Sequence, residues 1–283
     1  MQNSLDSTQL PSNSFAPVVL PTGASEPKPI PPIKRPERVS VWGTGFACVD
    51  MEQTLQLAER AIANRRPEYF VTANLNYLML TERHPRLQEV NERALAVIAD
   101  GQPIVRRSQR GPTPLPERVA GSDMIVELAR LSAEKGYKIY FLGAAPGVAQ
   151  AAADSLVQQF PGLQIAGVES PPFRQLTAAE HDTMIQRIRD SKPDILLVAF
   201  GQPKGECWIY DNLNDLNVPL SIQLGASFDF LAGTAKRAPK IWQKIGCEWL
   251  YRACSDPRRL MPRYASNILF LLKLLAKDLR PKS

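Results

Sequence analysis

The sequence predicts an α/β fold, in which a Rossmann-like, mostly parallel sheet carries helices on both faces. Short apolar runs recur along the chain, and stretches with the 3.6-residue period of an amphipathic helix separate them. The runs lack the alternation of a half-exposed strand, which is typical of parallel strands buried on both sides. A basic, leucine-rich C-terminal segment adds a helical appendage to this prediction.

Three regions differ in composition. Residues 1–38 contain eight prolines and no periodic apolar pattern, which predicts a disordered leader, with a Pro-rich docking segment as the alternative. Residues 39–235 hold the strand and helix patterns and are the expected core. Residues 236–283 are the expected basic helical appendage that binds the membrane or the acceptor.

The core elements follow in order. We expect strands at residues 38–43, 69–74, 95–99, 137–142, 163–168, 194–201 and 219–224. Asp50 and Gln53 form a predicted capping box at the start of the first helix. Further helices are expected at 75–93, at 117–134, after Gly147 and around 177–190, with a basic loop at 106–112.

A glycine pair, Gly43-Thr44-Gly45, resembles part of a dinucleotide-binding fingerprint. The third glycine of that fingerprint is absent, so we interpret the segment as an ordinary turn. This argues against an NAD-dependent epimerase or dehydrogenase, which would need the complete motif.

Polar residues or glycines follow several predicted strands, and Asp100 is the most informative of them. It ends the apolar run of residues 97–99 and precedes Gly101, so it is expected at the mouth of a cleft. The alternative is a carboxylate that only caps an Asp-Gly turn. The carboxyl ends of parallel strands share one edge, where ligands bind. The residues expected at this edge are Asn74, Asp100, Gly143, Gln202 and Asp229.

Cysteine and histidine usage limits the metal chemistry. Four cysteines lack paired spacing and only two histidines are present, so neither a structural zinc site nor a disulfide framework is expected. No Asp-x-Asp pair is available to hold a divalent ion on a diphosphate. The Met1 end lacks a secretory signal pattern, and no apolar run approaches the roughly 20 residues of a membrane span.

The positive charge lies at the C-terminal end. Residues 236–283 hold twelve Lys and Arg against three acidic residues, a net of +9, whereas the whole chain is +6 and the first 235 residues are therefore −3. Arginines beside tryptophans favour an anionic membrane surface over nucleic acid. The alternative is a helical subdomain that packs its leucines internally. The arginines concerned are Arg237, Arg252, Arg258, Arg259 and Arg263.

Several motifs together resemble the WecG/TagA/CpsF glycosyltransferases, glycosyltransferase family 26. The resemblance covers about residues 39–270. Its motifs are Thr72-Ala73-Asn74, Ala99-Asp100-Gly101-Gln102-Pro103-Ile104-Val105, residues 116–123, Phe200-Gly201-Gln202-Pro203-Lys204, residues 225–233, Arg237-Ala238-Pro239, Glu248-Trp249-Leu250-Tyr251-Arg252 and Pro257-Arg258-Arg259.

The resemblance implies inverting, metal-independent transfer of an N-acetylmannosamine-type sugar from a UDP donor to undecaprenyl-diphosphate-linked GlcNAc, without a cofactor. Asp100 would be the general base, and Thr72 and Asn74 would hold the sugar. Arg118 would contact a phosphate or fix Asp100, unless it only pairs with Glu117 or Asp123. Gly143, Gln202 and Asp229 would frame the nucleotide, and the five C-terminal arginines would meet the acceptor diphosphate or the membrane.

The resemblance implies a peripheral protein that acts at the inner face of the cytoplasmic membrane. Whether the protein forms homo-oligomers is left open. Alternatives are a family member that uses UDP-linked N-acetylmannosaminuronic acid, glucose or galactose, and a non-catalytic protein that binds anionic lipid.

The chain departs from the family pattern at one position. The family often has Gln where this chain has Gly205, between Lys204 and Glu206, so a ligand contact is either lost or supplied by Gln202.

Overall fold

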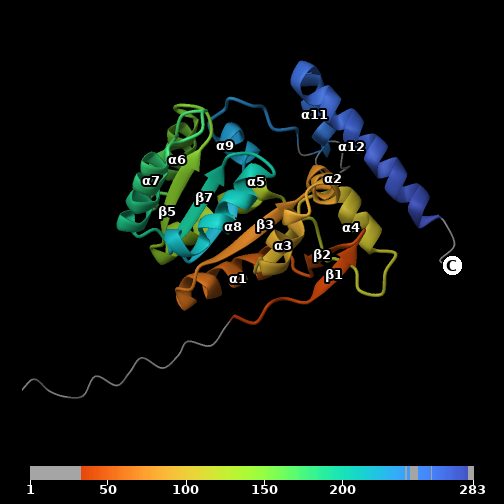
Figure 1. Cartoon of the computed structure of the whole chain (residues 1–283), viewed down its shortest axis with the longest axis horizontal. Coiled ribbons are helices and arrows are strands. Elements are labelled where there is room, and N and C mark those ends of the chain that lie inside the picture. The colour runs from red at the N-terminus through yellow and green to blue at the C-terminus, as the bar shows by residue number, and fades with distance from the viewer. Residues whose placement is uncertain (1–32, 240, 243–247, 256, 280–283) are drawn as a thin grey trace, which may run out of the picture. The chain divides into compact units, whose positions relative to one another are not determined.

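A six-stranded parallel sheet forms the centre of the molecule (Figure 1). The computed structural model describes residues 33–239, 241–242, 248–255 and 257–279. The strand order is β4-β3-β8-β7-β5-β6, and every neighbouring pair is parallel. The strands are β3 (Glu68–Ala73), β4 (Ala96–Ala99), β5 (Lys138–Gly143), β6 (Gln164–Glu169), β7 (Ile195–Ala199) and β8 (Leu220–Gln223).

Helices cover both faces of the sheet, because its strands alternate with helices along the chain. One face packs against α1 (Met51–Asn64), α5 (Gly121–Lys135), α6 (Val148–Gln159) and α9 (Ala226–Leu231). The other packs against α2 (Leu75–Arg83), α3 (Arg86–Arg93), α4 (Gln102–Ser108), α7 (Ala178–Ser191) and α8 (Lys204–Leu216). The predicted Rossmann-like α/β class is thus confirmed.

Two further helices, α11 (Glu248–Ser255) and α12 (Pro257–Asp278), follow the core. Phe270 and Leu274 of α12 are buried in the hydrophobic cluster that also contains Leu78 of α2. The ribbon in Figure 1 shows α12 running past α2, and the two helices are in contact. The basic end of the chain is therefore helical, as predicted. Within the described part of the chain, no helix is both long and apolar enough to cross a membrane.

The first predicted strand is one arm of a hairpin outside the main sheet. The strands β1 (Arg38–Val41) and β2 (Thr44–Ala47) pair antiparallel, and Trp42 and Gly43 form the turn with positive φ angles of 50° and 83°. The interpretation of Gly43-Thr44-Gly45 as an ordinary turn is confirmed. The strand β2, which lies between this turn and α1, was not predicted.

Other boundaries also differ. The predicted helix at 75–93 is two helices, separated at His84 and Pro85. The helix predicted from residue 117 begins at Gly121, because the Val119 N–H donates to the carbonyl of Ala99 and keeps the preceding segment extended beside β4. The predicted capping box of Asp50 and Gln53 is present in α1. Most of the predicted leader, up to residue 32, lies outside the described residues, and the domain boundaries stay predictions.

Candidate active site

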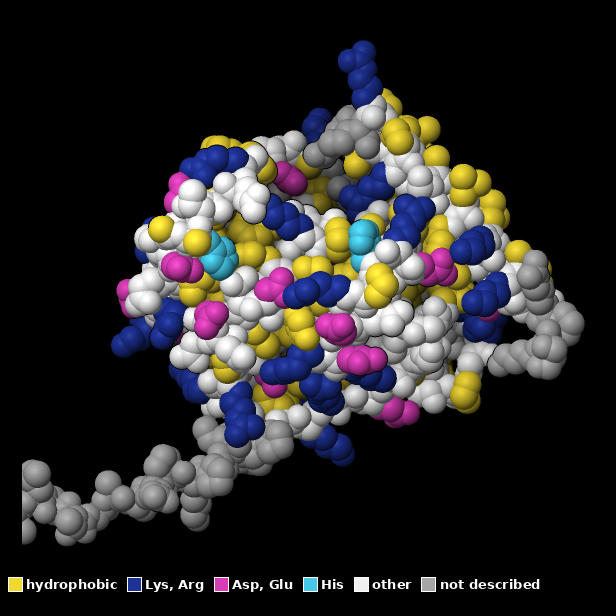
Figure 2. Space-filling view, viewed as in Figure 1, with side chains coloured by type: hydrophobic (Ala, Val, Ile, Leu, Met, Phe, Trp, Pro, Cys, Tyr) yellow, Lys and Arg dark blue, Asp and Glu magenta, His cyan; other side chains and the backbone are white. Residues whose placement is uncertain are grey.

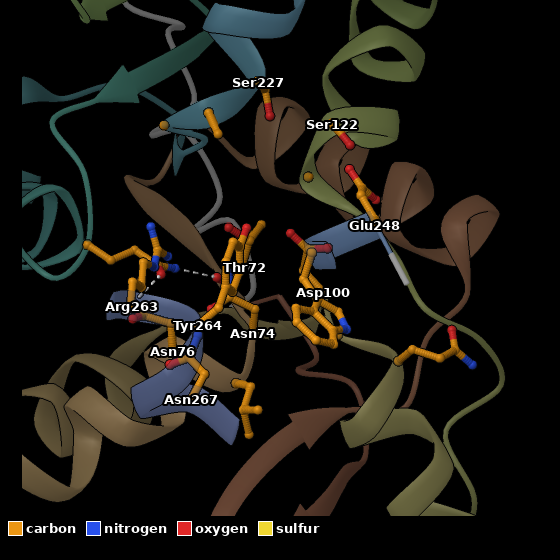
Figure 3. Close-up of a pocket in the computed structure, with 18 of the residues that line it drawn as sticks. Thr72, Asn74, Asn76, Asp100, Ser122, Ser227, Glu248, Arg263, Tyr264 and Asn267 are labelled. Atoms are coloured by element: carbon orange, nitrogen blue, oxygen red, sulfur yellow. Dashed lines mark hydrogen bonds between the residues drawn. The ribbon is translucent and has the colours of Figure 1, made fainter. Parts of the chain in front are cut away.

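A cavity of about 330 Å³ opens at the carboxyl edge of the sheet. Figure 3 shows its labelled side chains, which come from strand ends, from α2, α5 and α9, and from the C-terminal helices. The ends of β3, β4 and β8 and the loop after β7 form the floor, because parallel strands deliver their carboxyl ends to one edge. Of the residues predicted for the site, the cavity is lined by Thr72, Asn74, Asp100, Arg118, Gln202 and Arg263.

Asp100 follows β4 directly. Its backbone N–H donates to the carbonyl of Ala73 (3.0 Å), which holds the residue at the end of the sheet. Burial raises the pKa of its carboxyl group to about 7, although Arg118 and a hydrogen bond from the Gly121 N–H act in the opposite direction. Glu248 also raises this pKa. Such a carboxylate is about half ionised near neutrality, where it can accept a proton.

The neighbouring strand end is held by side-chain to backbone hydrogen bonds. The Thr72 hydroxyl donates to the carbonyl of Gln223 (3.1 Å), and the Gln202 amide donates to the carbonyl of Thr72 (3.1 Å). Asn74 caps α2 by accepting from the Tyr77 N–H (3.1 Å). Thr72, Asn74 and Gln202 are therefore fixed beside one another before any ligand binds.

Arg118 forms an ion pair with Glu248, the first residue of α11, at 3.4 Å between Nη1 and Oε2. The two alternative partners that the sequence suggested, Glu117 and Asp123, do not pair with Arg118. Glu117 instead accepts from the Met51 N–H at the start of α1 (2.7 Å), and Asp123 pairs with Arg237 (2.7 Å). Arg118 is thus directed into the cavity rather than along its own segment.

The C-terminal helices complete the cavity. Arg263 of α12 lines it, whereas Arg237 lies beside Asp123 on α5. Arg258 is exposed, and the side chains of Arg252 and Arg259 lie outside the described part of the structure. The other cavity residues from α11 and α12 are Glu248, Trp249, Tyr264, Asn267, Ile268 and Leu271.

Two predicted residues lie at the same sheet edge but are not among those that line this cavity. Gly143 ends β5 with a φ of 106°, and its carbonyl accepts from the Ser170 hydroxyl (2.9 Å). Asp229 lies on α9 and accepts from the Thr234 hydroxyl (3.3 Å). The lining residues also include Gln223 and Asn267, which sequence reasoning missed because Gln223 lies within a predicted strand and Asn267 lies on α12, away from any strand end.

The described residues bring together no group of three or more His, Cys, Asp or Glu side chains that could hold a metal ion. Metal independence itself stays a prediction.

These features together define an enzyme of the α/β class, with a raised-pKa carboxylate in a cleft at the carboxyl edge of its sheet. The chain belongs to the glycosyl transferase WecG/TagA/CpsF family, whose model matches residues 39–283. It is therefore a glycosyltransferase, as the resemblance of its motifs predicted.

Curated relatives agree with this assignment. The chain is 30% identical over 239 residues to an N-acetylglucosaminyldiphosphoundecaprenol N-acetyl-beta-D-mannosaminyltransferase of Staphylococcus aureus strain MW2, covering 84% of this chain and 92% of the relative. A protein of the same name from Staphylococcus aureus strain NCTC 8325 matches with the same identity and coverage.

Proposed function

We propose that this protein transfers N-acetylmannosamine from a UDP donor to undecaprenyl-diphosphate-linked N-acetylglucosamine, with inversion and without a metal. The names of the relatives support the transferred sugar and the acceptor. The proposed reaction mechanism rests on one observation. Asp100 lines the cleft, and the pKa of its carboxyl group is raised to about 7.

Asp100 would act as the general base. A single displacement needs one group to take the proton of the attacking acceptor hydroxyl, and no covalent nucleophile. The raised pKa makes Asp100 a stronger base than an ordinary carboxylate while a large fraction remains ionised at neutral pH. The hydrogen bond from the Gly121 N–H orients the carboxylate.

The donor would lie along the ends of β3, β7 and β8. Thr72 and Asn74 would bind sugar hydroxyls or the acetamido group, and Gln202 is held against Thr72 by its 3.1 Å hydrogen bond. Departing UDP carries negative charge that protein donors must stabilise, and Arg118 and Arg263 are the cationic side chains of the cavity. Gly143 and Asp229 would serve a nucleotide that extends beyond the cavity.

The acceptor would approach from the membrane along α12. Hydrophobic side chains gather over this helix at the upper right edge of the face in Figure 2. Leu269 and Leu272 are 69% and 56% exposed, while Ile268 and Leu271, on the same helix, line the cavity. A basic helix with exposed leucines suits peripheral binding to an anionic membrane, here the cytoplasmic face. Bound there, α12 would hold the lipid-linked diphosphate beside Arg263.

The test measures UDP release from a panel of UDP-sugars, with and without a lipid-diphosphate-GlcNAc acceptor, in the presence of EDTA. We expect acceptor-dependent release from UDP-N-acetylmannosamine. Release from UDP-linked N-acetylmannosaminuronic acid, glucose or galactose instead would contradict the proposed donor. Loss of activity in EDTA, restored by a divalent ion, would contradict metal independence. No acceptor-dependent release from any donor would refute the proposed function.

A further inference from the structure

Glu248 brings a second carboxylate into the cavity from the C-terminal helices. It is the first residue of α11, and it lines the same cavity as Asp100 and Arg118 (Figure 3). Its side chain and that of Arg118 are only 16% and 18% exposed, so their 3.4 Å ion pair is shielded from water. A pair in such surroundings interacts more strongly than one at the surface.

Arg118 therefore stands between two carboxylates. Its positive charge lowers the pKa of Asp100, and the negative charge of Glu248 raises it. The ion pair of Arg118 is with Glu248, whose negative charge opposes the effect of the guanidinium on Asp100.

The charged groups around Asp100 come from several elements. Arg118 precedes α5 and Asp123 lies on it, while Arg237 follows α9 and also interacts electrostatically with Asp100. Arg237 is paired with Asp123 at 2.7 Å. Glu248 begins α11, and Arg263 of α12 lines the cavity. Among these groups, Glu248 joins the C-terminal helices to the segment that carries Arg118.

We propose that Glu248 is a positioning residue, which holds Arg118 so that Asp100 remains a free base. This inference rests on the proposed function. Glu248 acts only when α11 lies against the core, so seating of the C-terminal helices completes the catalytic carboxylate as well as the cavity wall. When these helices are displaced, Arg118 loses Glu248 and pairs with Asp100. The pKa of Asp100 then falls, and Asp100 becomes a weaker base.

The test is the pH profile of kcat/KM for Glu248→Gln in the full chain, because this ratio reports the ionisation of the free enzyme. In the unaltered protein the acid limb is expected near pH 7, where Asp100 ionises. In Glu248→Gln we expect the limb to move down by roughly one pH unit and the plateau to fall about tenfold. UDP affinity, measured by calorimetry, is expected to stay within about twofold.

Two variants serve as controls. Glu248→Asp keeps the charge, so its acid limb is expected close to that of the unaltered protein. Glu117→Gln removes an exposed acidic group that neighbours Arg118 in the sequence. Glu117 accepts a hydrogen bond from the Met51 N–H and does not pair with Arg118, so this variant should leave the pH profile unchanged. An unmoved limb in Glu248→Gln, with kcat/KM lowered equally at all pH values, would refute the positioning role. So would a shift in Glu248→Asp as large as in Glu248→Gln. Neither result would touch the proposed function, which the donor panel with the unaltered protein tests separately.

Discussion

The side chain of Gln223 occupies the space that any side chain at Gly205 would need. A Cβ atom at position 205 would lie 1.9 Å from the Gln223 Oε1 and 2.4 Å from its Cδ. That oxygen accepts from the Phe200 N–H (3.2 Å) at the end of β7, and Gln223 is only 2% exposed. The resemblance led us to expect Gln at position 205, and Gln223 of β8 places an amide in the same region. Gln223 joins Gln202 as a candidate for the ligand contact that the sequence left open.

Gly205→Ala should therefore destabilise the protein, because the new methyl group displaces Gln223 from the Phe200 N–H. Leaving that donor unpaired costs about 1–3 kcal/mol. Urea unfolding of Gly205→Ala, Gln223→Ala and the double variant measures this. In the Gln223→Ala background the cost of Gly205→Ala should largely vanish. An equal cost in both backgrounds would show that the two positions are independent.

Glu206, which follows Gly205, gives a pH prediction. It is 1% exposed, and burial raises the pKa of its carboxyl group to about 8. The native state thus keeps a proton that the unfolded chain loses above about pH 4.5, so stability should fall as the pH rises from about 5 to 8. Glu206→Gln should remove this part of the slope. Urea midpoints at pH 5 and pH 8 test it, and an unchanged difference between them would contradict the prediction.

Much of the fold could be predicted from local pattern. The strands β4 and β7 are uninterrupted apolar runs, and burial on both faces leaves that signature in the sequence itself. The helix α8 was missed although Ile209, Leu213 and Leu216 have helical spacing, because Gly201, Pro203 and Gly205 suggested a flexible loop. The short strand β2 was missed because Thr44-Gly45-Phe46-Ala47 carries little strand signal.

Some residues of the candidate site could also be predicted from the sequence, and others could not. Asn74, Asp100 and Gln202 were predicted together because topology alone brings strand ends to one edge, whereas Thr72 was predicted from the family resemblance. The partner of Arg118 could not be predicted. Glu248 lies far away in the sequence, and only the seating of α11 places it in the cavity.

Asp278 fastens the end of α12 to the core. It accepts two hydrogen bonds from Arg107 (2.5 and 2.9 Å) and one from the Trp42 indole (3.0 Å). Asp278→Asn should lower stability by about 1 kcal/mol and release the end of α12, which limited proteolysis would detect. Glu134→Gln, which removes an exposed pair on α5, is the control and should change neither property. Equal cleavage of both variants would contradict a fastening role.

The apolar face of α12 should bind membranes. Leu269→Glu places a charge at a 69% exposed position, so the fold should persist while co-sedimentation with anionic vesicles falls about tenfold or more. Phe173→Glu is a matched control, because Phe173 is 81% exposed and lies in the loop before α7 rather than on α12. Deletion of residues 236–283 should abolish vesicle binding. Unchanged sedimentation of Leu269→Glu would contradict the membrane role of this face.

The central claim is that Asp100 accepts the proton of the attacking hydroxyl. The most direct measurement compares Asp100→Asn with the unaltered protein in acceptor-dependent UDP release and in UDP binding. The amide keeps the shape of the carboxylate but is a negligible base, so turnover should fall at least about 100-fold while the Kd for UDP stays within about twofold. Turnover within a few-fold of the unaltered protein, with UDP binding intact, would contradict the assignment of Asp100 as the base.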